Sequence, residues 1–149
     1  MKLLGKMFAL VADKFKDKTD KQGLPYILHC IYVMQNCGLK SEAGLCKALG
    51  HDLYEDCKDQ GIDLDFLVRE FNLDIAMGIY TLSHDKDKES YEDYIKKVVN
   101  SIDKDLVYIK AADLEHNTQV SRLKDLSKKN LDRLEKYFKA YTYIKSELK

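Results

Sequence analysis

The spacing of the apolar residues is the strongest constraint on the fold of this chain. Apolar residues recur at intervals of three and four, and no stretch alternates apolar and polar residues as a half-buried strand does. Only one proline and seven glycines interrupt this pattern along 149 residues. The sequence therefore predicts an all-α fold. A chain of this length forms one compact domain with a real core, so we expect a single helical domain over residues 1–149.

Caps and breakers predict where the helices begin and end. The first helix is expected over about 3–15, and Pro25 is expected at the first position of the second helix. Ser41 is a candidate cap for the third helix, and the last helix is expected over about 130–148. The polar stretch SHDKDKES (83–90) is expected to form a loop that borders or covers a site.

The charge balance and the cysteines exclude several classes of protein. Lys plus Arg equals Asp plus Glu at 25 each, so no overall positive field exists to hold a nucleic acid polymer or an anionic membrane. No apolar run approaches the roughly 20 residues of a membrane span, and the first segment lacks a secretory cleavage pattern. The four cysteines lack CxxC spacing, which favours reduced core thiols over a disulfide or a zinc site. We expect a cytoplasmic protein without a membrane partner, and the sequence leaves its oligomeric state open.

The first chemical feature is the motif HDLYED, which brings together His51, Asp52, Glu55 and Asp56. Residues four apart lie on the same face of a helix, so these groups share two turns. So many carboxylates repel one another unless a cation offsets the charge, and imidazole beside carboxylate suits Mn, Fe or Zn better than calcium. The alternative is a solvated acidic helix face without a ligand.

Two further polar residues stand in apolar surroundings. His29 lies between Leu28 and Ile31 in the second expected helix, and Asp113 lies in the apolar segment VYIKAADLEHN. Burial of either group is costly without a partner. His29 could be a hydrogen-bonded core histidine, and Asp113 could pair with Lys110 or Arg122. A shared ion held by His29, His51, Asp52 and Asp113 explains all these residues together and leaves coordination positions open to water and phosphate.

Five segments in a fixed order carry a family resemblance: QGLPYILH, HDLYED, ESYEDYI, IKAADLEHNT and RLEKYFKAY. Together they cover most of the chain from about Lys14 to Tyr141. This set resembles the HD phosphohydrolase superfamily, in particular the Rel/Spo-type alarmone hydrolases and their small stand-alone members. The resemblance implies a helical HD domain that removes pyrophosphate from the 3′ position of guanosine tetra- or pentaphosphate. The chain ends where the long enzymes begin a synthetase domain, so hydrolysis without synthesis is the implied activity.

The resemblance also implies a role for individual residues. The four residues that could share an ion match the family's ligands to a manganese-like ion, and Glu55 with Asp56 matches the acidic pair that orients and activates the attacking water. Asn117 matches a residue that touches the nucleotide, and Lys21 matches a basic residue near the base and phosphates. Tyr94 and Lys97 are further candidates for the pocket, because they precede a helix that should return toward the metal.

One departure from the family bears on the substrate. The long alarmone enzymes carry an arginine that packs on the base just before the position of Lys21, and this chain has Asp20 there. Two alternatives to alarmone hydrolysis therefore stay open. The first is an HD phosphohydrolase that acts on another nucleotide or phosphoester. The second is a regulatory domain that binds a nucleotide without hydrolysing it.

Overall fold

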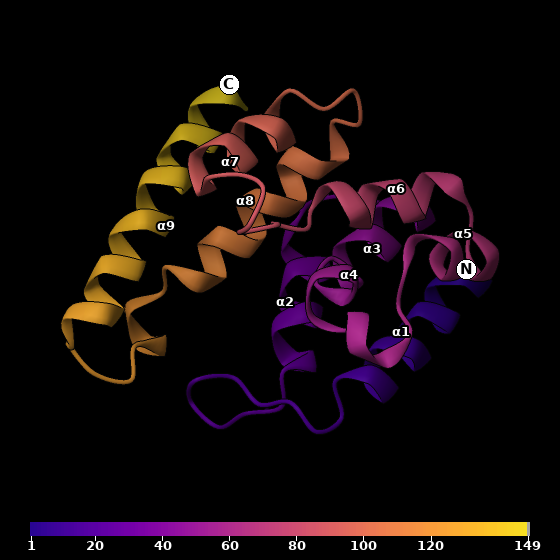
Figure 1. Ribbon diagram of the computed structural model, residues 1–149, viewed down its shortest axis with the longest axis horizontal. Helices are drawn as coiled ribbons and strands as arrows, with labels where there is room; N and C mark the ends of the chain where they lie inside the picture. Colours follow the sequence, from indigo (N-terminus) through magenta and orange to yellow (C-terminus); the bar gives the residue numbers. More distant parts are fainter. Residues whose placement is uncertain (149) are drawn as a thin grey trace.

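The computed structural model describes residues 1–148, and it is built from helices joined mostly by short loops (Figure 1). The α-helices in chain order are α1 Lys2–Lys14, α2 Ile27–Asn36, α3 Glu42–Leu49, α4 Leu53–Asp56, α5 Leu64–Glu70, α6 Leu73–Thr81, α7 Tyr91–Val99, α8 Asp105–Asn117 and α9 Lys128–Glu147. Two short 3-10 helices, η1 Lys58–Gln60 and η2 Val120–Arg122, complete the set. Within residues 1–148 the extended pairing is limited to a bridge between Thr19 and Pro25. The predicted all-α fold is confirmed.

Side-chain caps begin several of these helices, as expected from the sequence. The Ser41 hydroxyl accepts a hydrogen bond from the backbone N of Gly44 at 3.0 Å, so the predicted cap of α3 is confirmed. Ser127 caps α9, which therefore begins at Lys128, two residues before the expected start. The prediction that Pro25 opens α2 is wrong by two residues. The chain through Pro25 pairs with Thr19 and stays extended, so the helix begins at Ile27.

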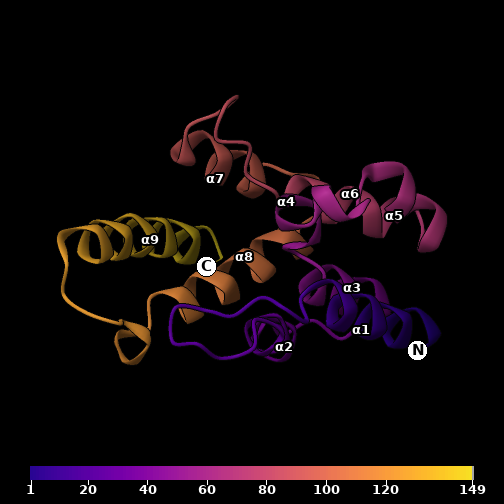
Figure 2. The ribbon, with the colours of Figure 1, turned by 60° about the horizontal axis from the view of Figure 1, so that its bottom comes forward.

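Helix α8 lies in the middle of the molecule, as Figure 2 shows, with α9 on one side and α2 and α3 on the other. Two clusters of buried apolar residues result. One lies mainly among α1, α3, α5 and α6, the other is built mainly on α7, α8 and α9, and Met34 on α2 packs against both. Helix α8 contributes its buried apolar residues to the second cluster, and α4 contributes Leu53 to the first.

A buried lysine joins three parts of the fold. The side chain of Lys47 on α3 is only 2% exposed, and its Nζ lies 3.0 Å from Asp74 Oδ1 on α6 and 2.7 Å from Asp103 Oδ2 just before α8. Gly78 leaves room for the aliphatic stem, because a Cβ there would lie 2.7 Å from Lys47 Cδ. Burial alone would lower the pKa of Lys47, but the two aspartates outweigh it and raise the pKa. No helix within residues 1–148 is long and apolar enough to cross a membrane.

Candidate active site

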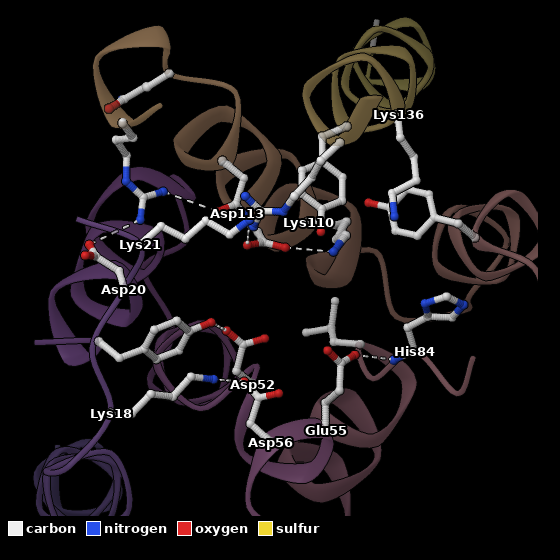
Figure 3. Close-up of a pocket in the computed structure, with 18 of the residues that line it drawn as sticks. Lys18, Asp20, Lys21, Asp52, Glu55, Asp56, His84, Lys110, Asp113 and Lys136 are labelled. Carbon is white, nitrogen blue, oxygen red and sulfur yellow. Dashed lines mark hydrogen bonds and ion pairs between the residues drawn. The ribbon is translucent and has the colours of Figure 1, made fainter. Parts of the chain in front are cut away.

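A cavity of about 360 Å³ opens where α4, α8 and α9 meet two loops, residues 15–26 and residues 82–90. In Figure 3 the carboxylates of Asp52, Glu55 and Asp56 line one wall and face Lys110 and Asp113 across the cavity. The loop that contains SHDKDKES contributes His84 and Lys86 to the rim. The expectation that this loop borders a site therefore agrees with the structure.

The four residues predicted to share an ion come from three parts of the chain and lie close together. Asp52 and Asp113 line the cavity, whereas the two buried histidines are not among its lining residues. His29 lies on α2, Asp113 lies on α8, and His51 and Asp52 lie in the turn between α3 and α4. His29 Nε2 is 3.0 Å from Asp113 Oδ1, and His51 Nε2 is 3.5 Å from the same oxygen. Asp52 Oδ2 lies 3.1 Å from His51 Nε2 and 3.7 Å from His29 Nε2. Both histidines and Asp113 are buried and lie close enough to hold one metal ion.

The hydrogen bonds of His51 test whether these residues fit a cation. Its Nδ1 lies 2.8 Å from the carbonyl oxygen of Ala48, which can only accept, so Nδ1 carries a proton. The buried Nε2 has no hydrogen-bond partner within residues 1–148 and faces the carboxylates of Asp52 and Asp113. Burial lowers the pKa of His51, but the two carboxylates outweigh it and raise the pKa well above its usual value. The position attracts positive charge, so the donor set fits a divalent cation.

His29 is held in a matching way by His116 on α8. His29 Nδ1 lies 2.7 Å from His116 Nδ1, and the His116 ring stacks on Tyr32 at 4.0 Å. Burial, Arg122 and His29 lower the pKa of His116 to about 4, so its ring is neutral at pH 7. One of the two Nδ1 atoms donates in this contact, which fixes the His29 ring so that its Nε2 faces Asp113 Oδ1.

Lys110 balances the charge of Asp113 through the carboxylate oxygen that does not face the histidines. Its Nζ donates to Asp113 Oδ2 at 2.7 Å, and both side chains are buried. Burial raises the pKa of Asp113, but Lys110 and the two histidines outweigh it and keep that pKa well below the usual range. The salt bridge to Lys110 considered from the sequence is present, so it coexists with the candidate metal arrangement rather than replacing it.

Asp52 is fixed by a tyrosine from the segment before α2. The Tyr26 hydroxyl donates to Asp52 Oδ2 at 2.5 Å. Burial and the neighbouring carboxylates raise the pKa of Tyr26, so the phenol keeps its proton and remains a donor. One oxygen of Asp52 is therefore oriented by protein while it also faces His51.

The acidic pair on α4 is held by two different loops. Glu55 Oε1 accepts a hydrogen bond from the backbone N of His84 at 2.6 Å, and Asp56 Oδ2 accepts from Lys18 Nζ at 2.8 Å. Burial and the Asp52 carboxylate raise the pKa of both Glu55 and Asp56, although Lys18 opposes the rise at Asp56. Carboxylates with raised pKa values beside a candidate metal site are suited to accept a proton from water.

The residues predicted to bind substrate do not all reach the cavity. Lys21 and Asn117 line it, and Asn117 Nδ2 donates to Asp113 Oδ1 at 2.9 Å. Tyr94 also lines the cavity, but its buried hydroxyl donates to the carbonyl oxygen of Leu82. Lys97 is not among the lining residues. Its Nζ pairs with Glu89 at 2.8 Å, because α7 turns that side of the helix toward the 83–90 loop.

Basic side chains outnumber acidic ones around the cavity. The lining includes five acidic residues and seven basic residues, the latter being Lys18, Lys21, Lys86, Lys110, Arg122, Arg133 and Lys136. Three of the seven pair with carboxylates, and the other four have no ion-pair partner within residues 1–148. An overall neutral chain therefore gathers unpaired positive charge at this one cavity, which favours a ligand with several negative charges.

Several residues in and around the cavity could have been found from the spacing along α8 and α9. Lys110 and His116 lie three residues before and after Asp113, so one face of α8 carries all three. Arg133, Lys136 and Tyr137 lie on neighbouring turns of α9 and reach the same cavity. Lys18 stands outside the long helices, and no periodic signal points to it. Arg122 was considered from the sequence as a partner of Asp113, but it contacts Asn117 and Asp20 instead.

No protein-family model and no curated protein matches the sequence. Ten chains of solved structures match the fold. One of them is described as a metazoan ortholog of SpoT that hydrolyzes ppGpp and plays a role in starvation responses. The alignment covers 100% of this chain and 86% of that chain, with a TM-score of 0.79 and 22% sequence identity. This chain therefore has the fold of that hydrolase.

Proposed function

We propose that this protein is a metal-dependent phosphohydrolase. The observation that carries the proposal is the convergence of His29, His51, Asp52 and Asp113 beside a cavity that Asp52 and Asp113 line together with unpaired basic side chains. The particular reaction we propose is the removal of the 3′-pyrophosphate from guanosine tetra- or pentaphosphate. The shared fold with a ppGpp hydrolase and the ordered segments of the sequence support this substrate.

His29, His51, Asp52 and Asp113 would hold the ion. Two imidazoles with two carboxylates suit manganese, and iron or zinc would accept the same donors. A bound divalent cation supplies Lewis-acid polarisation of the phosphoryl group and lowers the pKa of water. Tyr26, Lys110 and His116 orient the donors, so the arrangement needs little reorganisation.

Glu55 and Asp56 would take the proton from the attacking water. Glu55 has one oxygen fixed by the His84 backbone, and its raised pKa brings it closer to that of a base that works near neutral pH. Water attacks the phosphorus next to the ribose, the bond from phosphorus to the 3′ oxygen breaks, and that oxygen leaves with a proton. The products are pyrophosphate and guanosine 5′-diphosphate from the tetraphosphate, or guanosine 5′-triphosphate from the pentaphosphate. Lys21 and Asn117 would contact the nucleotide.

The test is pyrophosphate release from guanosine tetraphosphate by the manganese-loaded protein. Wild type should release pyrophosphate, and Asp52→Ala should not, because it removes a proposed metal ligand. Lys139→Gln is a matched control, since Lys139 pairs with Glu135 on the exposed side of α9. Absence of turnover by wild type, or unchanged turnover in Asp52→Ala, would rule out this function.

A different nucleotide is the second candidate substrate, and Asp20 in the cavity wall favours it. A panel of nucleotide phosphoesters offered to the same preparation separates the two, since this alternative predicts faster turnover of another compound. A domain that only binds a nucleotide would show saturable binding and no product. For the chain as a whole, we propose one HD-type domain over residues 1–149 that works in the cytoplasm.

A further inference from the structure

Asp20 has a place in the site that its sequence position does not reveal. Its Oδ1 accepts hydrogen bonds from the backbone N of Gln22 at 2.8 Å and of Leu24 at 3.0 Å. Its Oδ2 lies 3.6 Å from Arg122 Nη2 on η2, and both side chains are largely buried in the cavity wall. Asp20 therefore shapes its own loop with one oxygen and meets a guanidinium with the other.

Arg122 also contacts Asn117 on α8. Its Nη1 donates to the carbonyl oxygen of His116 at 3.0 Å and to Asn117 Oδ1 at 3.2 Å. The guanidinium has only donors, and an ionised carboxylate has only acceptors. The amide of Asn117 lies between Arg122 and Asp113, so just one of its two orientations satisfies both neighbours.

In that orientation Asn117 Nδ2 donates to Asp113 Oδ1 at 2.9 Å. The same oxygen faces His29 Nε2 at 3.0 Å and His51 Nε2 at 3.5 Å, so it is the oxygen placed to bind an ion. The contacts run from Asp20 through Arg122 and Asn117 to Asp113. They join the 15–26 loop to the candidate metal site.

We infer that Asp20 and Arg122 are positioning residues, which fix the amide of Asn117 and through it the metal-binding oxygen of Asp113. This inference rests on the metal site of the proposed function. A hydrogen bond that orients a ligating carboxylate changes metal affinity by about tenfold to a hundredfold. With two N–H groups on Nη1 donating to His116 and Asn117 and one on Nη2 facing Asp20, two N–H groups of Arg122 are left for a ligand in the cavity that it lines.

The experiment measures the manganese dissociation constant of the full chain by titration calorimetry. Asp20→Asn keeps an oxygen that can accept the two backbone hydrogen bonds, and it replaces the charged oxygen that faces Arg122 with an uncharged NH2 group. We expect it to weaken manganese binding severalfold, and Arg122→Gln to weaken binding by about tenfold. The double variant should bind no more weakly than Arg122→Gln, because both changes break the same series of contacts.

Gln22→Ala is the matched control. Gln22 Nε2 donates to the carbonyl oxygen of Ser121 at 3.0 Å, so it fastens the same loop to the same segment without touching Arg122. Its manganese affinity should stay within about twofold of wild type, and thermal melts of all metal-free variants should show that they are folded. Equal weakening in Gln22→Ala, additive losses in the double variant, or unchanged affinity in both single variants would overturn the inference.

The outcomes separate this inference from the proposed function. Weakened manganese binding in Asp20→Asn, together with no hydrolysis by wild type, supports the positioning role and refutes the proposed reaction. Hydrolysis by wild type, together with unchanged manganese affinity in Asp20→Asn and Arg122→Gln, supports the proposed reaction and refutes the positioning role. A wild-type protein that binds neither manganese nor iron nor zinc refutes both.

Discussion

Replacing Lys110 by methionine should destabilise the metal-free protein much more than the metal-loaded one. Lys110 Nζ is 2.7 Å from Asp113 Oδ2, and the two side chains are 11% and 7% exposed. Methionine keeps the volume of the stem but leaves a buried carboxylate without its cation. Breaking a buried pair in this way costs about 3–5 kcal/mol. Asn117 still donates to Asp113, so we expect the free energy of unfolding to fall by about 3 kcal/mol.

For a chain of this size that loss lowers the melting temperature by about 6–12 °C. A divalent cation on Asp113 supplies the missing positive charge, so manganese should recover part of the stability. If half is recovered, about 1.5 kcal/mol, the variant binds manganese about tenfold more tightly than wild type.

The assay is thermal and urea unfolding at pH 7, with and without saturating manganese. The pH matters because the pKa of Asp113 is held well below its usual value. The stability from this pair is present above the unfolded pKa of about 4 and is lost as the pH falls toward the lower, folded pKa. Lys139→Met breaks an exposed pair with Glu135 and should cost less than about 0.5 kcal/mol. Equal losses for Lys110→Met with and without manganese would refute the reasoning.

Three further predictions address the base, a ligand and the core. Activity should fall as the pH drops through the pKa of Glu55. Because burial and Asp52 raise that pKa, the acid limb of the pH–rate profile should lie above the usual carboxyl range. An acid limb at the ordinary carboxyl pKa would contradict this prediction. His116→Phe should keep the ring stacking but weaken manganese binding about tenfold or more by calorimetry, whereas His116→Asn, with an acceptor, should retain more affinity. Lys47→Met leaves Asp103 without its buried partner, at a cost of about 2 kcal/mol in the free energy of unfolding. The melting temperature should therefore fall by about 4–8 °C. An unchanged melting temperature would show that the ion pair is dispensable.

Much of the fold could be predicted because its signals are local. The interval of three and four between apolar residues specifies helices, and Ser41 caps α3 as its side chain leads one to expect. The prediction that Pro25 opens α2 was wrong because Pro25 pairs with Thr19, six residues earlier in the chain. No local helix signal reports that contact. The start of α2 therefore depended on a pairing between chain segments rather than on local preference.

The candidate site divides in the same way. His29, His51, Asp52 and Asp113 could be proposed from the sequence because polar groups in apolar helices need partners, and the structure brings these four together. A tertiary contact alone determines the neighbour of Asp56, which is Lys18 from the loop before α2. Arg122 reaches Asn117 from only five residues along the chain, through a turn that no helix signal reports.

Lys97 shows the limit of spacing arguments. Its position on α7 was expected to face the cavity, but the rotation of that helix about its axis turns Lys97 toward Glu89. That rotation is set by the packing of α7 against α8 and α9, and the periodicity of one helix does not specify it.

The most direct test of the central claim is a manganese titration of metal-free protein with guanosine tetraphosphate as substrate. Metal content and pyrophosphate release are measured on the same samples. We predict no release without metal, and a rate that rises in proportion to occupancy and levels off at one ion per chain. Release without metal, or none at full occupancy, would contradict the account.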